Sequence, residues 1–183
     1  MASTDLSSFN NKWYKPGASI LKRALWYICN PVFINSYLLP FSSIKCNLLR
    51  LFGANIGVNV VIKPKVNIKY PWKLCIGNYS WIGENVWIDN LDWVEIGEHC
   101  CVSQGAMLLT GNHNYKKKSF DLMIGKIILE NGVWIGAKSI VCPGVLAKNH
   151  AVLTVGSVAS ETLEANTIFS GNPAKKVKGR IIE

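Results

Sequence analysis

The chain has 183 residues, a hydrophobic fraction of 49% and a formal net charge of +9, which suits one domain with a sizeable core. The positive balance favours anionic partners, such as a phosphate-bearing cofactor or an acidic membrane surface. The excess cations form no single block, so nucleic acid is not an expected partner. The six cysteines form no Cys-x-x-Cys pair, and no histidine stands at metal-finger spacing from them. This argues against a zinc site and predicts reduced thiols in a cytoplasmic protein.

The chain opens with a polar stretch, residues 1–17, that includes Pro16 and Gly17. This composition predicts an extended, poorly ordered lead-in. The stretch has no continuous apolar core, so we do not expect a secretory signal sequence.

Residues 18–52 form a segment of different character. Apolar residues recur in it at spacings of three and four, which predicts helix, and Pro31 and Pro40 divide that helix into pieces. No uninterrupted apolar run approaches the roughly 20 residues needed to cross a bilayer. We expect this N-terminal helical segment to pack on the rest of the chain. The alternative is peripheral contact with a membrane surface through residues 18–50, which would place the protein at the cytoplasmic face of a membrane.

Residues 53–158 form the next segment, and from Ile56 its sequence repeats with a period of six. The first position of each six is aliphatic, and in the final run, 129–158, the first and sixth positions of all five sixes are apolar. An α-helix would place residues six apart on opposite faces, and an alternating strand has a period of two. A coil of short parallel strands accounts for the pattern, because each six supplies one strand and one corner, and stacking buries the aliphatic column.

The repeat is interrupted in three places. Residues 69–72 and 90–93 shift the register briefly, whereas the interruption at 110–126 leaves the coil and returns to it. Loops of that kind on a rigid scaffold often carry function. After Val158 the period ends, and we expect residues 159–183 to form a tail. Its four closely spaced cations are Lys175, Lys176, Lys178 and Arg180. These cations are either solvated or placed to contact a phosphate.

One histidine differs from the other two. His99 and His150 occupy the fourth position of a six, where a coil corner would face solvent, whereas His113 lies on the long interruption. Imidazole can accept a proton near neutral pH and pass it on. His113 is therefore the candidate catalytic residue.

Several motifs together resemble a known family. They are the sixes, the run Thr110-Gly-Asn-His113, the turns Val133-Trp-Ile-Gly136 and Gly156-Ser157, and the ending Gly171-Asn-Pro-Ala174. The chain resembles the hexapeptide-repeat acyltransferases, and among them the sugar O-acetyltransferases of the maltose, galactoside and nodulation-factor type. It is still more similar to the acetyltransferases of the colanic acid (exopolysaccharide) type, through Trp13-Tyr-Lys-Pro-Gly17, Lys69-Tyr-Pro-Trp-Lys73 and Ser103-Gln-Gly105.

The resemblance implies an all-β fold, a left-handed parallel β-helix that is an exception to the usual right-handed crossover. It implies a homotrimer that binds acetyl-CoA between neighbouring coils, with no metal. His113 would be the general base for an acceptor hydroxyl that attacks the thioester directly, without a covalent intermediate. The acceptor would be a sugar or a polysaccharide precursor.

The resemblance also assigns residues to the two substrates. The coenzyme contacts it implies are Trp134, Ala137, Val155, Ser160, Glu161, Lys175 and Lys178. This chain has Thr154-Val-Gly-Ser157 where the family usually has Gly-Ala-Gly-Ser, and Glu161 where the family usually has lysine. Because Glu161 cannot bind a phosphate, the tail cations would have to do so. The expected acceptor contacts are Asn85, Asp89, Asn90 and Asp92.

Two alternatives to a sugar O-acetyltransferase stay open at this point. One is an acetyltransferase for an amine or an antibiotic-like acceptor, and the other is a non-catalytic β-helix scaffold. Large aromatic residues on the flanks of the coil favour self-association, because a thin coil cannot bury them all. These residues are Trp72, Trp81, Trp87, Trp93 and Trp134.

Overall fold

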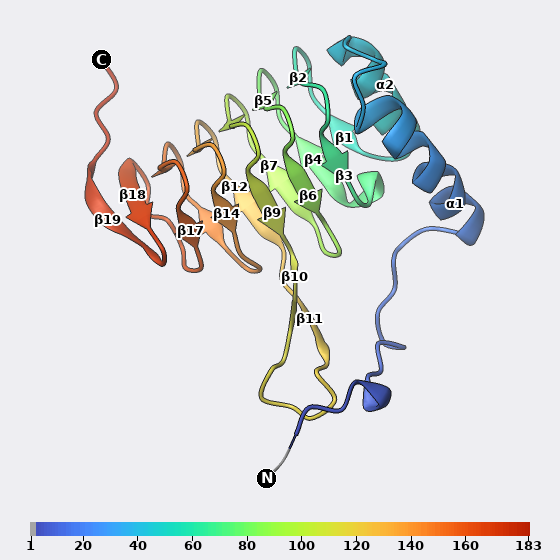
Figure 1. Cartoon of the computed structure of the whole chain (residues 1–183). Helices are drawn as coiled ribbons and strands as arrows, with labels where there is room; N and C mark the ends of the chain where they lie inside the picture. Colours follow the sequence, from blue (N-terminus) through green and yellow to red (C-terminus); the bar gives the residue numbers. More distant parts are fainter. Residues whose placement is uncertain (1–2) are drawn as a thin grey trace.

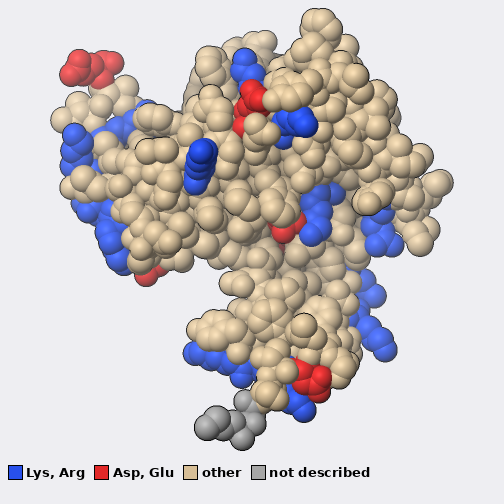
Figure 2. Space-filling model, viewed as in Figure 1, with Lys and Arg blue, Asp and Glu red and all other residues tan. Residues whose placement is uncertain are grey.

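The computed structural model describes residues 3–183 and confirms the predicted coil. The chain is a left-handed parallel β-helix with helices packed at one end and a hairpin projecting from its middle (Figure 1). Short strands from successive turns pair in parallel, so the coil has three sheets along its length. In the space-filling view of Figure 2, the hairpin stands out below the body as a separate arm.

The strands fall into three parallel sheets and one hairpin. The first sheet contains β1 (Asn55–Ile56), β4 (Leu74–Ile76), β7 (Val94–Ile96), β12 (Ile127–Leu129) and β15 (Leu146–Ala147). The second sheet contains β2 (Val61–Ile62), β5 (Trp81–Ile82), β8 (Cys101–Val102), β13 (Trp134–Ile135), β16 (Val152–Leu153), β18 (Thr167–Gly171) and β19 (Ala174–Gly179). The third sheet contains β3 (Asn67–Ile68), β6 (Trp87–Asp89), β9 (Met107–Leu109), β14 (Ile140–Val141) and β17 (Val158–Ala159). The hairpin contains β10 (Gly111–His113) and β11 (Leu122–Ile124).

Each position of the six has its own structural task. The aliphatic first position points inward, and Ile135 is fully buried between Val102 and Leu153 of the neighbouring turns. The fourth position turns a corner with a left-handed backbone, so His99 and His150 lie at corners with φ of +55° and +58°. Glycine at the second position allows close stacking of the turns.

Gly136 shows why the second position is small. A Cβ added to it would lie 2.6 Å from the backbone nitrogen of Val155 in the next turn. Backbone atoms of a paired strand cannot move away without breaking the parallel ladder. The stacking distance of the coil therefore requires glycine at this position.

The helical segment closes the first end of the coil. Helix α1 (Ile20–Cys29) begins after Ser19, whose side chain accepts a hydrogen bond from the Lys22 backbone N–H, and α2 (Ser42–Leu51) begins after Pro40. Helix α1 ends at Cys29, two residues before Pro31, and Pro31 lies in a π-helical turn, η2 (Asn30–Ile34), that follows it directly. Trp26 anchors α1 by donating its indole N–H to the Ile68 carbonyl at 2.9 Å.

The lead-in differs from the prediction over residues 3–17; residues 1 and 2 lie outside the described part. It contains a short 3-10 helix, η1 (Leu6–Ser8), and makes specific contacts at both ends. The backbone N–H of Asp5 donates to the Lys118 carbonyl at 2.9 Å, and the indole N–H of Trp72 donates to the Pro16 carbonyl at 2.7 Å. The expectation of a poorly ordered lead-in is therefore wrong for these residues, because its partners lie on distant segments.

The tail also differs from the prediction, because the coil does not end at Val158. Leu163 and Phe169 are buried like the aliphatic column before them, and β18 pairs in parallel with β16. A shortened step between Ala159 and Leu163 hides this turn from a strict period of six. The chain then reverses, and β19 pairs antiparallel with β18, capping the far end of the coil.

Of the five tryptophans expected on the flanks of the coil, one is buried and four are exposed. Trp72 is buried against the lead-in, in contrast to its predicted place on an exposed flank, whereas Trp81, Trp87, Trp93 and Trp134 are 40% to 57% exposed. All six cysteines are free. Burial raises the pKa of the Cys100 thiol to about 11, consistent with an inert core thiol.

Candidate active site

His113 lies on the hairpin with its ring held between two aromatic side chains. Phe120 stacks against it at 4.5 Å between ring centroids, and Phe9 of the lead-in lies at 5.8 Å on a tilt. The Nδ1 atom lies 2.9 Å from the Phe120 carbonyl oxygen. Because a carbonyl oxygen can only accept, Nδ1 carries the hydrogen, and Nε2 keeps its lone pair free to accept a proton.

The hairpin is fixed to the coil at Thr110, which is fully buried. Its hydroxyl donates to the Asp89 carbonyl at 2.9 Å and accepts from the Asp92 backbone N–H at 2.9 Å. Three residues later the chain reaches His113. The corner 89–92 of one turn therefore sets where the arm leaves the coil.

The lead-in ties the same corner to the far part of the arm. The Tyr14 hydroxyl donates to the Leu91 carbonyl at 2.8 Å, and Asp5 pairs with Lys118, with Nζ 3.4 Å from Oδ2. Burial raises the pKa of the Tyr14 phenol and lowers the pKa of the Lys73 ammonium, which lies over the Tyr14 ring. The neutral phenol keeps its proton, so its hydrogen bond to the corner persists over the ordinary pH range.

Three of the predicted coenzyme residues gather on the coil wall. Trp134 faces outward in the second sheet, half-exposed, and its indole N–H donates to the Ser103 hydroxyl at 2.9 Å. Ala137 and Val155 lie at the corresponding corners of successive turns, where the Gly156 N–H donates to the Ala137 carbonyl at 2.9 Å. These residues form one outward-facing strip of wall.

The remaining coenzyme residues lie toward the capped end. Ser160 and Glu161 are exposed, and Lys175 reaches Glu161, with Nζ 3.9 Å from Oε2. Lys178 is exposed on β19. Arg180 is not free for a phosphate, because its guanidinium donates to the backbone carbonyls of Gly132 and His150.

The expected acceptor residues separate into two kinds. Asn85 is exposed at a corner with φ of +58°, and Asp89 forms an ion pair with Lys69 at 2.8 Å. Asp92 caps its own corner, accepting from the Trp93 backbone N–H at 2.8 Å. Asn90 is fully buried, and its amide binds the backbone of residues 70 and 73. The assignment of Asn90 to the acceptor is therefore wrong, because its polar atoms already hold the register shift at 69–72 in place.

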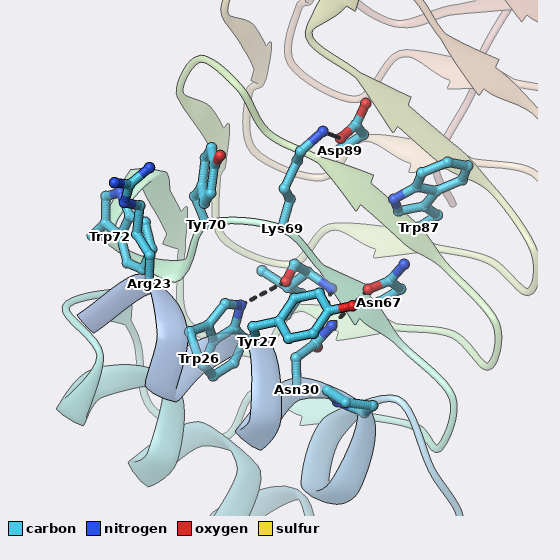
Figure 3. Close-up of a pocket in the computed structure, with 12 residues that line it drawn as sticks. Arg23, Trp26, Tyr27, Asn30, Asn67, Lys69, Tyr70, Trp72, Trp87 and Asp89 are labelled. Atoms are coloured by element: carbon cyan, nitrogen blue, oxygen red, sulfur yellow. Dashed lines mark hydrogen bonds and ion pairs between the residues drawn. The ribbon is translucent and has the colours of Figure 1, made fainter. Parts of the chain in front are cut away.

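A pocket of about 570 Å³ lies beside this corner, between α1 and the first turns of the coil (Figure 3). Rings of Tyr27, Tyr70 and Trp87 surround it, and the Lys69–Asp89 pair lies at one end. Asn30 donates to Asn67 across its floor at 2.7 Å. Aromatic walls with a few fixed polar groups suit a polar ligand that has apolar faces.

The structure thus brings Asp89 and Asp92 to the root of the arm that carries His113. It brings the coenzyme residues to the other half of the coil. Within residues 3–183, no hydrogen bond or ion pair joins His113 to any of the predicted coenzyme-binding residues. Among the same residues, no cluster of three or more His, Cys, Asp or Glu is arranged to hold a metal ion.

Sequence reasoning missed the residues that position the histidine. Phe9 and Phe120 are single aromatic residues in irregular stretches, without a motif of their own. The run Trp13-Tyr-Lys-Pro-Gly17 was noticeable in the sequence, and its Tyr14 does reach the corner. The residues of α1 that line the pocket follow a helical spacing. This spacing predicts that the helix packs on the coil, but it does not predict a ligand-binding site.

Comparison with known proteins shows a close full-length relative. An Escherichia coli (strain K12) protein named as a colanic acid biosynthesis acetyltransferase is 35% identical over 178 residues, which cover 97% of each chain. The galactoside O-acetyltransferase of the same organism is 25% identical over 72% of this chain and 66% of its own. No protein-family model matches the chain.

Solved structures agree in fold. A hexapeptide-repeat acetyltransferase of Vibrio cholerae, solved with acetyl coenzyme A, superposes with a TM-score of 0.80 at 21% identity, over 91% of this chain and 92% of its own. A galactoside acetyltransferase in complex with coenzyme A gives a TM-score of 0.76 at 22% identity, over 87% of this chain and 80% of its own. With the full-length relative, these likenesses place the chain in the hexapeptide-repeat acetyltransferase family, as an acyltransferase.

Proposed function

We propose that this enzyme transfers an acetyl group from acetyl-CoA to a hydroxyl of a sugar or polysaccharide precursor, with His113 as the general base. The observation that carries the proposal is the hydrogen bond from Nδ1 of His113 to the Phe120 carbonyl. It leaves Nε2 as a proton acceptor on an arm that stands away from the coil. A scaffold protein has no need of a base fixed in one tautomer.

The proposed reaction uses His113 as follows. Nε2 takes the proton of the acceptor hydroxyl while the hydroxyl oxygen attacks the thioester carbonyl carbon. The tetrahedral oxyanion then collapses, the carbon–sulfur bond breaks, and the leaving thiolate takes the proton from the imidazolium. The histidine is regenerated, and no covalent intermediate on the enzyme is needed when both substrates are held together.

Acetyl-CoA is proposed to lie along the strip of wall formed by Trp134, Ala137 and Val155. Support comes from its exposure, from the neighbouring Lys175 and Lys178, and from the two solved structures that hold acetyl coenzyme A or coenzyme A. Glu161 lies within ion-pair distance of Lys175. Bound phosphate would compete with Glu161 for this lysine, so Lys178 would bear more of the phosphate charge.

The acceptor is proposed to bind in the pocket between α1 and the coil. Its Asp89 end adjoins Thr110, at the root of the His113 arm. Its rings can cover the apolar faces of a sugar, and Lys69, Asp89 and Asn30 offer donors and acceptors to hydroxyls. The names of the two Escherichia coli relatives, which refer to colanic acid and galactoside, support a sugar-like acceptor.

The enzyme is proposed to be a homotrimer. The outward column of the second sheet places Trp81, Cys101 and Trp134 in one register, and both tryptophans are about half-exposed. A monomer would present these rings to water as an apolar flank. Trimer assembly would also allow the arm of one protomer to reach the strip of wall at Trp134, Ala137 and Val155 of another protomer. Light scattering should give about three times 20.3 kDa, and a mass near 20.3 kDa itself would overturn the proposal.

The decisive experiment measures acceptor-dependent release of coenzyme A. The protein is incubated with acetyl-CoA and with sugars, sugar nucleotides, oligosaccharides, amino sugars or chloramphenicol. Products are then treated with mild alkali, which cleaves an acetyl ester but leaves an acetyl amide intact. We expect release with a sugar hydroxyl and an alkali-labile product. An amide product would assign an amine acceptor instead, and no release with any acceptor would favour the scaffold.

A further inference from the structure

Helix α1 exposes its apolar stripe to the outside of the molecule. Ile20, Leu21, Leu25 and Ile28 recur on one face and are 48% to 76% exposed. The opposite face carries Trp26, which is buried. Surface helices of soluble proteins normally place the apolar stripe inward. The outward stripe of α1 therefore needs an apolar environment that the chain itself does not supply.

The apolar surface extends beyond α1 along the same end of the molecule. Exposed apolar residues continue through η2, the following loop and α2: Val32, Phe33, Leu38, Phe41, Ile44 and Leu51. In Figure 2 the upper right of the molecule, over α1 and α2, is almost entirely tan and shows no red atoms. We call the exposed apolar residues of 20–51 the outer helical face.

The net charge of the protein is concentrated in the same part of the chain. Residues 6–83 contain ten Lys and Arg and no Asp or Glu, whereas the rest of the chain contains ten Lys and Arg against eleven Asp and Glu. The ten cations are Lys12, Lys15, Lys22, Arg23, Lys45, Arg50, Lys63, Lys65, Lys69 and Lys73. Lys45 is fully buried and donates to the Ile62 and Lys63 carbonyls, whereas Lys12, Lys15 and Lys63 are exposed. The outer helical face is exposed and apolar, and the segment that carries it has a strongly positive net charge.

We propose that the outer helical face binds the surface of an anionic lipid membrane. The stripe of α1 would enter the boundary between headgroups and acyl chains, with the helix lying along the surface, and the exposed cations of the segment, such as Lys12, Lys15 and Lys63, would be attracted to the lipid phosphates. Among residues 3–183, no helix is long and apolar enough to cross the membrane, so the contact is a surface one. This proposal is independent of the reaction proposed above.

A second copy of the chain is a poorer occupant of this face. Two such faces meeting about a two-fold axis would bring together two segments of net positive charge, with no acidic residue in either segment to pair with the cations. Like charges brought together in this way oppose assembly. An anionic bilayer satisfies the apolar stripe and the positive charge at once.

The test is flotation of the full-length protein with lipid vesicles. We expect binding to vesicles of phosphatidylcholine with phosphatidylserine, and a partition coefficient at least tenfold lower with phosphatidylcholine alone. Raising the salt concentration should weaken the binding, because it screens the attraction of the cations. The double variant Leu21→Gln and Leu25→Gln should lose at least tenfold in partition.

The matched control is Val177→Gln with Ile181→Gln. Both of these residues are exposed on the tail, far along the sequence from the helices, so the change in chemistry is the same but the place differs. The control should bind vesicles like the unmodified protein. Equal binding to both vesicle types, unchanged binding of the Leu21/Leu25 variant, or a lower mass of that variant in light scattering without loss of vesicle binding would each overturn the proposal. The last result would assign the face to a second copy.

Discussion

The coil and the hairpin arm hold their residues in place by opposite means. In the coil, every turn repeats the same three devices, an inward aliphatic residue, a left-handed corner and backbone pairing to the next turn, so that Ile135 contacts equivalent residues above and below. In the arm, β10 and β11 pair with each other, and the His113 ring is held by contacts to two residues, Phe120 and Phe9. Stability is therefore expected to reside in the coil and chemistry in the arm.

The sharpest way to test this comparison is to remove the imidazole. We expect His113→Ala to lower kcat by roughly 10²–10⁴, the range for the loss of a positioned general base. The melting temperature should hardly change, because His113 is outside the buried core. Steady-state kinetics and thermal unfolding of the same preparation measure both quantities.

His113→Gln is the companion variant, since it keeps a polar side chain of similar reach but cannot accept a proton at neutral pH. It should be as slow as His113→Ala. Full activity in either variant would eliminate the base mechanism, and a large fall in melting temperature would mean that the arm contributes to the core.

The converse change is made in the coil. Ile135→Ala removes a fully buried side chain and should lower the free energy of unfolding by about 2–5 kcal/mol. In the protein that remains folded, kcat should be nearly unchanged, because no reacting group moves. Ile128→Ala, on the outward face of β12, is the control and should cost clearly less. Equal losses at the two sites, measured by denaturant unfolding, would contradict the assignment of the aliphatic column as the core.

The same contrast explains how far the sequence could predict the structure. In the coil, the surroundings of a residue are other residues a few sixes away, so a local period reveals the strands, the corners and the buried column. The extra turn after Val158 was missed because the step from Ala159 to Leu163 is shorter than six, although Leu163 and Phe169 resume the spacing. Trp72 was misplaced because its cover, Pro16, comes from the lead-in.

The candidate site was predictable only in part. The long interruption identified His113 because it was the one place where the period failed at length. Its neighbours could not be predicted, since Phe9 and His113 are separated in sequence by the helical segment and the first turns of the coil and share no pattern. Asn90 was assigned to the acceptor from its polarity, whereas its burial makes it a clamp on the backbone.

A smaller effect is expected from the support of the histidine. Phe9→Ala removes one of the two aromatic side chains that flank the His113 ring and leaves the coil unchanged, so the imidazole should sample other orientations. We expect kcat to fall roughly 10- to 100-fold, as for a small misplacement of a reacting group, with little change in KM for acetyl-CoA. Phe9→Tyr should restore most of the rate. Leu6→Ala, an exposed residue of the same lead-in, is the control.

Phe9 would be a positioning residue on this view, and two results would show otherwise. If Phe9→Ala raised KM for acetyl-CoA and left kcat unchanged, the side chain would belong to a binding surface. If Leu6→Ala lowered kcat equally, the lead-in would act as a whole, through its contacts at Lys118 and Leu91, and not through one ring.

The smallest effect is expected at the capped end of the coil, where the proposed coenzyme strip meets the tail. Lys175 and Lys178 are exposed, so their attraction to phosphates is screened, and each should contribute about 1 kcal/mol to binding. Replacing both by Gln should raise KM for acetyl-CoA roughly tenfold and leave kcat nearly unchanged, which is the signature of binding lost equally in the ground and transition states.

Lys15→Gln with Lys63→Gln removes the same number of positive charges from the other end of the chain, so it separates a local contact from the general positive field of the protein. If that control raised KM as much as the tail variant, the field of the whole protein would attract the coenzyme. If the tail variant lowered kcat at unchanged KM, Lys175 and Lys178 would act on the reaction itself, and the strip of wall at Trp134, Ala137 and Val155 would lose its assignment to the coenzyme.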